Sequence, residues 1–427
     1  MHLLTTAAPV DAGDTAWIIV SMALVLLMTP GLAFFYAGMV RSKHALAMIM
    51  QSFTAIAVVS ITWVVVGYSL AFDTDAGGGL VGGLHLVGLA HAQDAVPGIP
   101  LTVPPLAFVA FQLMFAIITA ALISGASADR MRFGAFVTFL AIWSVVVYAP
   151  IAHWAWSPTG WLHRAGLLDF AGGTVVEISS GASALALALV LGPRRGWPRE
   201  MMAPHNLPLT LLGAGLLWFG WIGFNAGSAL TAGGLAASAA LATHLSGVGG
   251  MIGWLALEKR LTGKATTLGG ATGAVAGLVA ITPAAGFVAP VPAILIGVVA
   301  GVVCLFAIRL KFRFRYDDSL DVVAVHYVGG VIGTLAVGLL AATAVNPAVT
   351  HQGLLLGGGL GQVGRQLLGV LAASAFAFAA SYAIAWALRA TIGLRVTPEE
   401  EHEGLDSSQH AETAYELTAT SSIGRTS

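Results

Sequence analysis

The chain has 427 residues, of which 57% are hydrophobic and only 9% are charged, and its formal net charge is −1. A soluble domain carries roughly 25% charged residues, so this composition excludes a water-soluble globular protein. We expect a lipid bilayer around the chain and no nucleic acid among its partners.

Long apolar blocks follow one another along almost the whole chain. A bilayer core of about 30 Å needs about 20 apolar residues per helix. Eleven blocks qualify, with approximate limits 15–36, 45–71, 103–124, 133–152, 171–192, 207–226, 232–257, 267–285, 290–310, 322–343 and 366–389. Several are rich in glycine and alanine, as are helices that pack closely inside a bilayer. The sequence predicts an all-α integral membrane protein with eleven transmembrane helices.

The positions of lysine and arginine predict the orientation of these helices. If the N-terminus is outside, only Arg164 and Arg365 lie in outer connections. The other seventeen of the nineteen basic residues then lie inside: Arg41, Lys43, Arg130, Arg132, Arg194, Arg195, Arg199, Lys259, Arg260, Lys264, Arg309, Lys311, Arg313, Arg315, Arg389, Arg395 and Arg425. This is the positive-inside bias, and it predicts an odd number of spans, with N outside and C inside, in an inner (plasma) membrane. Residues 1–14 lack a basic n-region and a cleavage site, so no removable signal peptide is expected.

Two short patterns recur in the halves of the chain. Phe-Tyr-Ala-Gly at 35–38 ends the first span on the inside, and Phe-Asn-Ala-Gly at 224–227 ends the sixth on the outside. Five spans followed by five of reversed orientation is the inverted-repeat plan of many transporters. We therefore expect an inverted repeat of five plus five, with an additional C-terminal helix.

An ionisable residue inside a predicted span is expected to have a functional or structural role, because inserting it into the membrane costs at least ~2.5 kcal/mol on insertion scales. Only Glu177, His244 and His326 lie well inside one. Asp169 precedes Glu177 by eight residues, and Asp318 precedes His326 by eight, at entrances on opposite faces. We expect Glu177 and His326 to face one another and share a proton, or else to form a structural pair that locks two helices. His244 is interpreted as a hydrogen-bonded packing residue.

Several segments together resemble one known family. They are Phe111–Phe115, Asp169–Glu177, Pro204–Pro208, Gly220–Ser228, Asp317–His326 and the acidic tail through Tyr415. The chain resembles the ammonium transporter, methylammonium permease and Rhesus protein family from its first span to its tail, and the ammonium transporter branch in particular.

The resemblance implies roles for five residues. Trp156, Phe115 and Ser228 match an outer recruitment site, where an aromatic face and a hydroxyl hold the cation. Phe115 and Phe224 match two stacked rings that close the pore, and ordinary helix packing is the alternative for each aromatic residue. Asp169 matches a buried aspartate that either orients backbone groups or stabilises the cation electrostatically.

The chain departs from the family pattern at Glu177, where most members carry the first of two pore histidines. Some fungal and bacterial relatives carry an acidic residue there. A carboxylate beside His326 forms either a relay or an ion pair, and the two groups titrate as one coupled unit.

The implied function is ammonium transport for nitrogen uptake. Ammonium is deprotonated, ammonia crosses the apolar pore, and the proton moves by way of Glu177 and His326, so transport is electrogenic. A passive ammonia channel and an ammonium sensor of the same fold are the alternatives. A membrane metalloenzyme would need more than these two candidate ligands, so no enzyme activity, cofactor or metal is expected.

Residues 1–390 are assigned to the membrane domain and 391–427 to a cytoplasmic regulatory tail. Gly393 and residues 399–406 resemble the tail of homotrimeric relatives whose inner face is plugged by a PII-type nitrogen regulatory protein. Residues beyond Tyr415 are predicted to be disordered. The outer connection 73–102 is expected to serve mainly as a linker.

Overall fold

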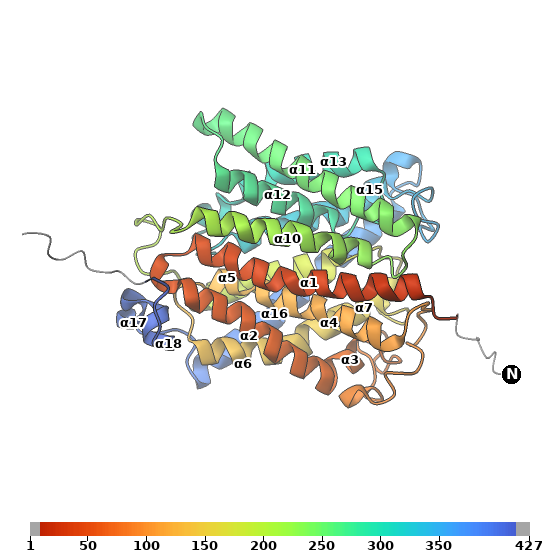
Figure 1. Ribbon diagram of the computed structural model, residues 1–427, viewed down its shortest axis with the longest axis horizontal. Helices are drawn as coiled ribbons and strands as arrows, with labels where there is room; N and C mark the ends of the chain where they lie inside the picture. The colour runs from red at the N-terminus through yellow and green to blue at the C-terminus, as the bar shows by residue number, and fades with distance from the viewer. Residues whose placement is uncertain (1–8, 416–427) are drawn as a thin grey trace, which may run out of the picture.

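The computed structural model describes residues 9–415 and shows one bundle of helices. Across these residues there is no β-strand, only two isolated bridges, Asp75–Gly82 and Met131–Arg395. The long helices run roughly parallel to a common axis (Figure 1). The predicted all-α class is confirmed, whereas the predicted disorder beyond Tyr415 and most of residues 1–14 lie outside the described residues.

Each predicted apolar block corresponds to a helix or to a run of consecutive helices. These are α1 (Ala12–Met39), α2 (Ala45–Thr62) with η2 (Trp63–Gly67) and α3 (Tyr68–Phe72), α4 (Pro105–Leu122) with α5 (Ser124–Ser127), α6 (Phe133–Trp143) with η4 (Ser144–Tyr148) and α7 (Ala149–Trp156), η5 (Gly173–Ile178) with α9 (Ser179–Leu191), α10 (Leu207–Gly227), α11 (Gly234–Thr262), α12 (Thr267–Ile281), α13 (Pro290–Ala307) with α14 (Leu310–Phe314), η6 (Val323–Tyr327) with α15 (Val328–Leu340), and α16 (Gly361–Thr391). Short helices connect or follow them: η1 (Ser42–His44), η3 (Val87–Leu89), α8 (Trp161–Arg164), η7 (Leu354–Leu356), α17 (Pro398–Glu403) and α18 (Leu405–His410). Between residues 9 and 415, ten helical segments are long and apolar enough to cross a membrane. The chain is therefore a multi-pass membrane protein.

The eighth predicted block is shorter as a helix than the sequence suggested. α12 has 15 residues and ends at Ile281, two residues before Pro283. Proline lacks the backbone N–H that would continue the helical hydrogen bonds, and its ring clashes with the preceding turn. The chain continues to Val288 in turns that are entirely buried. Irregular backbone is tolerated at membrane depth where protein surrounds it, so this segment fits the interior of the bundle.

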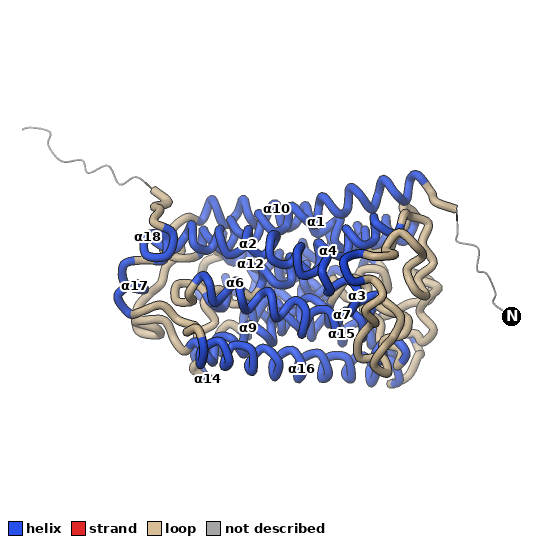
Figure 2. Tube along the Cα trace, turned by 90° about the horizontal axis from the view of Figure 1, so that it is seen from below, coloured by secondary structure: helices blue, strands red, loops and turns tan. Residues whose placement is uncertain are grey.

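The two ends of the described chain lie at opposite ends of the bundle. α1 begins at one end, whereas α16 finishes at the other, next to α17 and α18 (Figures 1 and 2). An odd number of crossings predicts this placement.

α1 and α10 carry the two recurring Phe-x-Ala-Gly patterns and pack side by side along their length (Figure 1). Their backbones approach closely because glycines meet there. A Cβ on Gly213 would lie 2.2 Å from the backbone N of Phe35, and one on Gly220 would lie 2.3 Å from Cγ of Met28. Small residues allow this close packing in a bilayer, and it brings Phe35 and Phe224 to opposite ends of the same interior space.

A network of buried charges joins the connections at the tail end of the bundle. Arg194 donates three hydrogen bonds to the Asp317 carboxylate, at 2.7, 2.9 and 2.9 Å. Arg130, fully buried, donates to Ser319 Oγ and to the backbone oxygens of Asp317 and Gly192. Burial alone would raise the pKa of Asp317, but its hydrogen bonds to Arg194 and the charge of Arg130 hold that pKa below its usual range. These contacts tie three distant connections together.

The segment after α16 folds back onto this network. Glu401 accepts a hydrogen bond from Arg395 at 2.7 Å and another from the backbone N–H of Arg195 at 2.7 Å. The Asp406 carboxylate accepts from the backbone N–H groups of Leu46 and Ala47, at the start of α2. The tail is therefore held to the body of the bundle by specific polar contacts.

Candidate functional site

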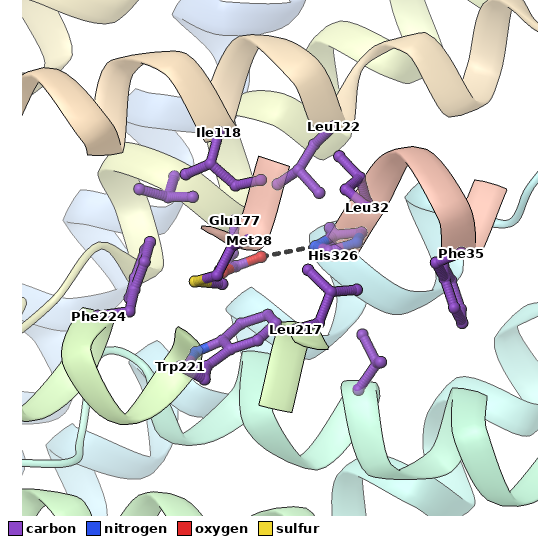
Figure 3. Close-up of a pocket in the computed structure, with 12 residues that line it drawn as sticks. Met28, Leu32, Phe35, Ile118, Leu122, Glu177, Leu217, Trp221, Phe224 and His326 are labelled. Carbon is purple, nitrogen blue, oxygen red and sulfur yellow. Dashed lines mark hydrogen bonds and ion pairs between the residues drawn. The ribbon is translucent and has the colours of Figure 1, made fainter. Parts of the chain in front are cut away.

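A small cavity lies in the centre of the bundle, between two phenylalanine rings. Its walls come from α1, α4, η5, α10, α12 and η6, and its lining residues are Met28, Leu32, Phe35, Ile118, Leu122, Val176, Glu177, Leu217, Trp221, Phe224, Val275 and His326 (Figure 3). Its free volume of about 10 Å³ accommodates one molecule the size of water. Glu177 and His326 are the ionisable residues of this otherwise mostly apolar wall.

Glu177 and His326 face one another across this cavity, as predicted. Oε2 of Glu177 lies 2.7 Å from Nδ1 of His326, and the two residues are 1% and 4% exposed (Figure 3). The second carboxyl oxygen, Oε1, is buried and has no hydrogen-bond partner among residues 9–415. One oxygen of the pair thus receives no hydrogen bond from the surrounding protein.

Two aspartates fix the helix starts that carry this pair. Asp169 accepts hydrogen bonds from the backbone N–H groups of Gly172, Gly173 and Thr174, at 2.8, 2.6 and 2.8 Å, and from the Thr174 hydroxyl. Asp318 accepts from the backbone N–H of Val323 at 2.7 Å. Both therefore lie at helix entrances, as the sequence indicated, and each starts a π-helical segment of the kind often found at functional sites.

Two glycines, each four residues after one member of the pair, let these helices cross closely. A Cβ on Gly330 would lie 2.7 Å from Cβ of Glu177, and one on Gly181 would lie 2.5 Å from Cβ of Tyr327. Any side chain there would push the Glu177 and His326 backbones apart. The matching intervals, Glu177 to Gly181 and His326 to Gly330, are a signal in the sequence that our reading of it missed.

A vestibule at the end of the bundle where α1 begins contains the predicted recruitment residues. Phe115, Trp156 and Ser228 line one cavity of about 370 Å³. The indole N–H of Trp156 donates to the backbone oxygen of Asp169 at 3.0 Å, which fixes the ring. The Ser228 hydroxyl donates to the Phe224 carbonyl at 2.9 Å, so its own oxygen lone pairs are free to accept.

Two phenyl rings separate this vestibule from the central cavity. The centroids of Phe115 and Phe224 are 4.2 Å apart with their planes tilted by 32°. Trp156 meets Phe115 edge-on at 5.8 Å. The two rings lie against one another, tilted rather than parallel, and Phe224 also lines the cavity of the Glu177–His326 pair.

A second vestibule, of about 220 Å³, opens at the other end of the pathway. Phe35, Val275 and His326 line both this vestibule and the central cavity. Phe35 therefore bounds the cavity on the side of this second vestibule, and Phe224 bounds it on the opposite side (Figure 3). Sequence reasoning noted Phe35 only as part of a recurring pattern and did not assign it to the pathway.

Two expectations are corrected by the structure. His244 is not a hydrogen-bonded packing residue: it is exposed on the surface of the bundle, its ring lies 5.5 Å from that of Trp218, and it has no hydrogen bond to any residue from 9 to 415. A helix presents residues in every direction, and apolar flanks alone did not reveal which side is buried. The connection 73–102 is more than a linker, because Gly98, Ile99 and Pro100 form part of the wall of the vestibule that contains Phe115, Trp156 and Ser228.

No group of three or more His, Cys, Asp or Glu side chains is placed to hold a metal ion in the region 9–415.

The two vestibules and the central cavity between them form a series of three spaces. A bare cation entering the central one would lose most of its water without gaining equivalent partners, at a cost of several kcal/mol.

Known proteins resemble the chain over nearly its whole length. A sequence profile described as the Ammonium Transporter Family matches residues 16–415. An ammonium transporter of Mycobacterium tuberculosis is 50% identical, over 96% of this chain and 92% of the relative. An ammonium transporter of Bacillus subtilis is 46% identical, over 95% of this chain and 98% of the relative.

Solved structures share the fold of this chain and part of its sequence. The crystal structure of Saccharomyces cerevisiae Mep2 superposes with a TM-score of 0.85 at 37% identity and covers 92% of each chain. A structure described as a sensor Amt protein superposes with a TM-score of 0.85 at 31% identity, over 93% of this chain and 98% of that one.

Proposed function

This chain belongs to the ammonium transporter family, and from that premise we propose that it recruits ammonium, removes a proton and conducts ammonia through the apolar pore, returning the proton by way of Glu177 and His326. The single observation that carries the proposal is the 2.7 Å contact between these two side chains in a cavity bounded by Phe224 and Phe35. Net movement is then that of ammonium, and it carries charge.

Recruitment takes place in the outer vestibule. The indole face of Trp156 attracts a cation through its quadrupole, and the hydrogen bond to Asp169 holds that ring in place. The Ser228 oxygen accepts one N–H of the ion because its own proton is already donated to Phe224. Phe115 supplies a second aromatic surface beside Trp156.

Selectivity follows from the loss of water at the ring pair. Potassium and ammonium carry the same charge and are of similar size, so a closure made by Phe115 and Phe224 opposes both as bare cations. Ammonium alone can leave its charge behind as a proton. Ammonia then crosses at low cost, and an acid–imidazole pair with one free carboxyl oxygen is suited to carrying the proton.

Asp169 acts mainly by holding the helix entrance. Both of its oxygens are occupied by hydrogen bonds from the start of η5, which supports a positioning role. Its negative charge below the vestibule adds long-range stabilisation of the cation.

We further propose eleven crossings in an inverted five-plus-five repeat, with α16 additional, the N-terminus outside and the C-terminus inside an inner (plasma) membrane. The pairing of Phe35 with Phe224, and of the Asp169–Glu177 segment with the Asp318–His326 segment, supports this repeat. α12 counts as a crossing that the buried turn at 282–288 completes. Residues 1–390 form the membrane domain, and the segment from 391 onward is a cytoplasmic regulatory tail.

Purified protein in proteoliposomes tests the function. We expect ammonium pulses to evoke a saturable current and equal potassium pulses to evoke none. A change in internal pH without current would identify a passive ammonia channel instead. The likeness to a sensor Amt protein makes a third outcome informative: ammonium binding with neither current nor pH change would indicate a sensor.

We also propose a homotrimer with a PII-type regulatory protein on the inner face. The hydrogen bonds of Glu401 with Arg195, and of Asp406 with Leu46 and Ala47, hold this segment against the end of the bundle, which supports a regulatory role for it. A pull-down at low 2-oxoglutarate and high ADP tests the partner. Recovery of no PII-type protein under those conditions would refute the regulatory half of the proposal.

A further inference from the structure

One titratable side chain lies in the wall of the vestibule that contains Phe115, Trp156 and Ser228, and the mechanism proposed above gives it no role. It is His163, which lies on the short helix α8 and is exposed. Within the described range 9–415, every other residue of this wall is apolar or carries an uncharged polar group. The vestibule that receives a cation under the proposed function therefore has one wall residue whose charge can change with pH.

The surroundings of His163 differ from those of two other exposed histidines, His85 and His91, which lie in the neighbouring connection. Nδ1 of His85 is 3.7 Å from the carboxylate of Asp73, and Nδ1 of His91 is 3.7 Å from that of Asp94. In the part of the chain that the structure describes, no carboxylate oxygen lies within 4.0 Å of a ring nitrogen of His163. A positive charge on His163 is therefore not offset by a paired acid.

The charged groups on the elements around α8 already have other partners. Arg164, the next residue, donates to a backbone oxygen at 3.0 Å. On α7, His153 is fully buried and lies 3.7 Å from the Asp75 carboxylate. Asp169 accepts hydrogen bonds from the start of η5 with both of its oxygens, and Arg365 of α16 lies beside the turn that follows α8. None of these groups supplies a free negative charge next to His163.

We propose that His163 sets the pH dependence of ammonium recruitment, because its protonated imidazolium repels the cation from the vestibule and its neutral imidazole does not. Histidine is the side chain whose charge ordinarily changes between pH 5 and pH 8. The vestibule has a volume of about 370 Å³, so a charge on its wall lies within about one Debye length, roughly 10 Å at 0.1 M salt, of an ion inside it. Salt therefore screens the repulsion only in part. His163 acts through its charge and is not a ligand of the ion.

This inference rests on the proposed recruitment site but not on electrogenic conduction, so its test measures binding. Isothermal titration calorimetry with ammonium chloride, and with sodium chloride as the blank, gives the Kd of the purified protein at pH 5 and at pH 8. Ammonium itself remains almost wholly protonated at both pH values. We expect the wild-type Kd to be about threefold higher at pH 5, the effect of two like unit charges about 7 Å apart in a mostly aqueous setting.

Three variants separate the charge of His163 from its shape. His163→Gln removes the charge, and its Kd at both pH values should equal that of wild type at pH 8. His163→Arg keeps a positive charge at both pH values, and its Kd should be raised at both. His91→Gln is the matched control, since His91 is exposed, lies outside the vestibule wall and has an acid beside it. It should keep the pH dependence of wild type.

A wild-type pH dependence in His163→Gln would overturn the inference, because another group such as His153 would then be responsible. A wild-type Kd that does not change between the two pH values would also overturn it. So would a His163→Arg protein that keeps a wild-type melting temperature and binds as tightly as wild type at pH 8. Loss of ammonium binding in wild type itself would overturn the recruitment site and this inference together. If binding follows the expected pattern while ammonium evokes no current, this inference stands and the conduction mechanism does not.

Discussion

Carboxylates meet basic side chains in two buried regions of this molecule, and the two regions are built differently. In the network at the tail end, three hydrogen bonds link Arg194 to Asp317, and Arg130 donates to four acceptor groups. In the pore, a single contact links Glu177 to His326, and one carboxyl oxygen has no partner within residues 9–415.

Under the proposed function, the network holds the connections together and the Glu177–His326 pair carries the proton. A charge that is surrounded by several fixed partners cannot move its proton without breaking them, whereas a pair with one bond and a free acceptor can exchange a proton with a passing molecule. Substitutions in the two regions should therefore affect different measured quantities: transport in the pore, stability in the network.

The largest effect is expected from His326→Ala. Removing the imidazole takes away one of the two proton-carrying groups of the central cavity, and we expect the ammonium-evoked current in proteoliposomes to fall by about 100-fold or more, as when a proton-transfer residue is lost. The melting temperature should change little by comparison. An undiminished and still selective current would refute the relay.

Arg194→Ala tests the other side of the comparison. It leaves the Asp317 carboxylate buried without its main partner, and breaking a buried pair costs about 3–5 kcal/mol. We expect a lower yield of folded protein and a lower melting temperature in detergent. Whatever protein folds should still exclude potassium, and Lys264→Ala, at an exposed position, serves as the control for loss of a basic residue at this end. A wild-type melting temperature for Arg194→Ala would contradict the structural role.

Glu177→His is expected to have a more moderate effect. It installs the histidine that most of the family is expected to carry, so transport should be retained within about tenfold, while its pH dependence or its selectivity changes because a neutral base replaces an acid. Currents measured at several pH values, with ammonium and then with potassium, check this. Complete loss of function in a well-folded variant would count against the equivalence.

The smallest effect is expected on the melting temperature when the pH is lowered, through the network of Arg130, Arg194 and Asp317. Since the pKa of Asp317 is held below its usual range, its contribution to stability is present above about pH 4 and is lost as the pH falls through its lower pKa in the folded protein. Melting temperatures between pH 7 and pH 3 should drop more steeply in wild type than in Asp317→Asn. Parallel curves for the two proteins would show that Asp317 is not the group responsible.

Several features of the site were predictable because they follow from composition and spacing along single helices. Glu177 and His326 are expensive in a span, and each follows an aspartate by eight residues, so a facing pair was expected and is present. The Phe115–Phe224 stack and the common vestibule of Trp156 and Ser228 were expected from the family resemblance alone. Spacing gave no hint of them, since aromatic residues on apolar helices are ordinarily packing residues.

Other features depended on which faces of distant helices meet. Gln112 and His244 are both polar residues in apolar helices, yet one is buried in a vestibule wall and the other is exposed on the bundle surface. The same ambiguity hid Phe35, whose place at the inner end of the cavity depends on close contact between α1 and α10. The sequence alone determined that the chain spans a membrane and which few ionisable residues lie inside its spans, because burying charge in lipid is costly wherever it occurs. Only the tertiary structure decided which side chains line the pathway, because a helix presents every direction and its neighbours select the buried one.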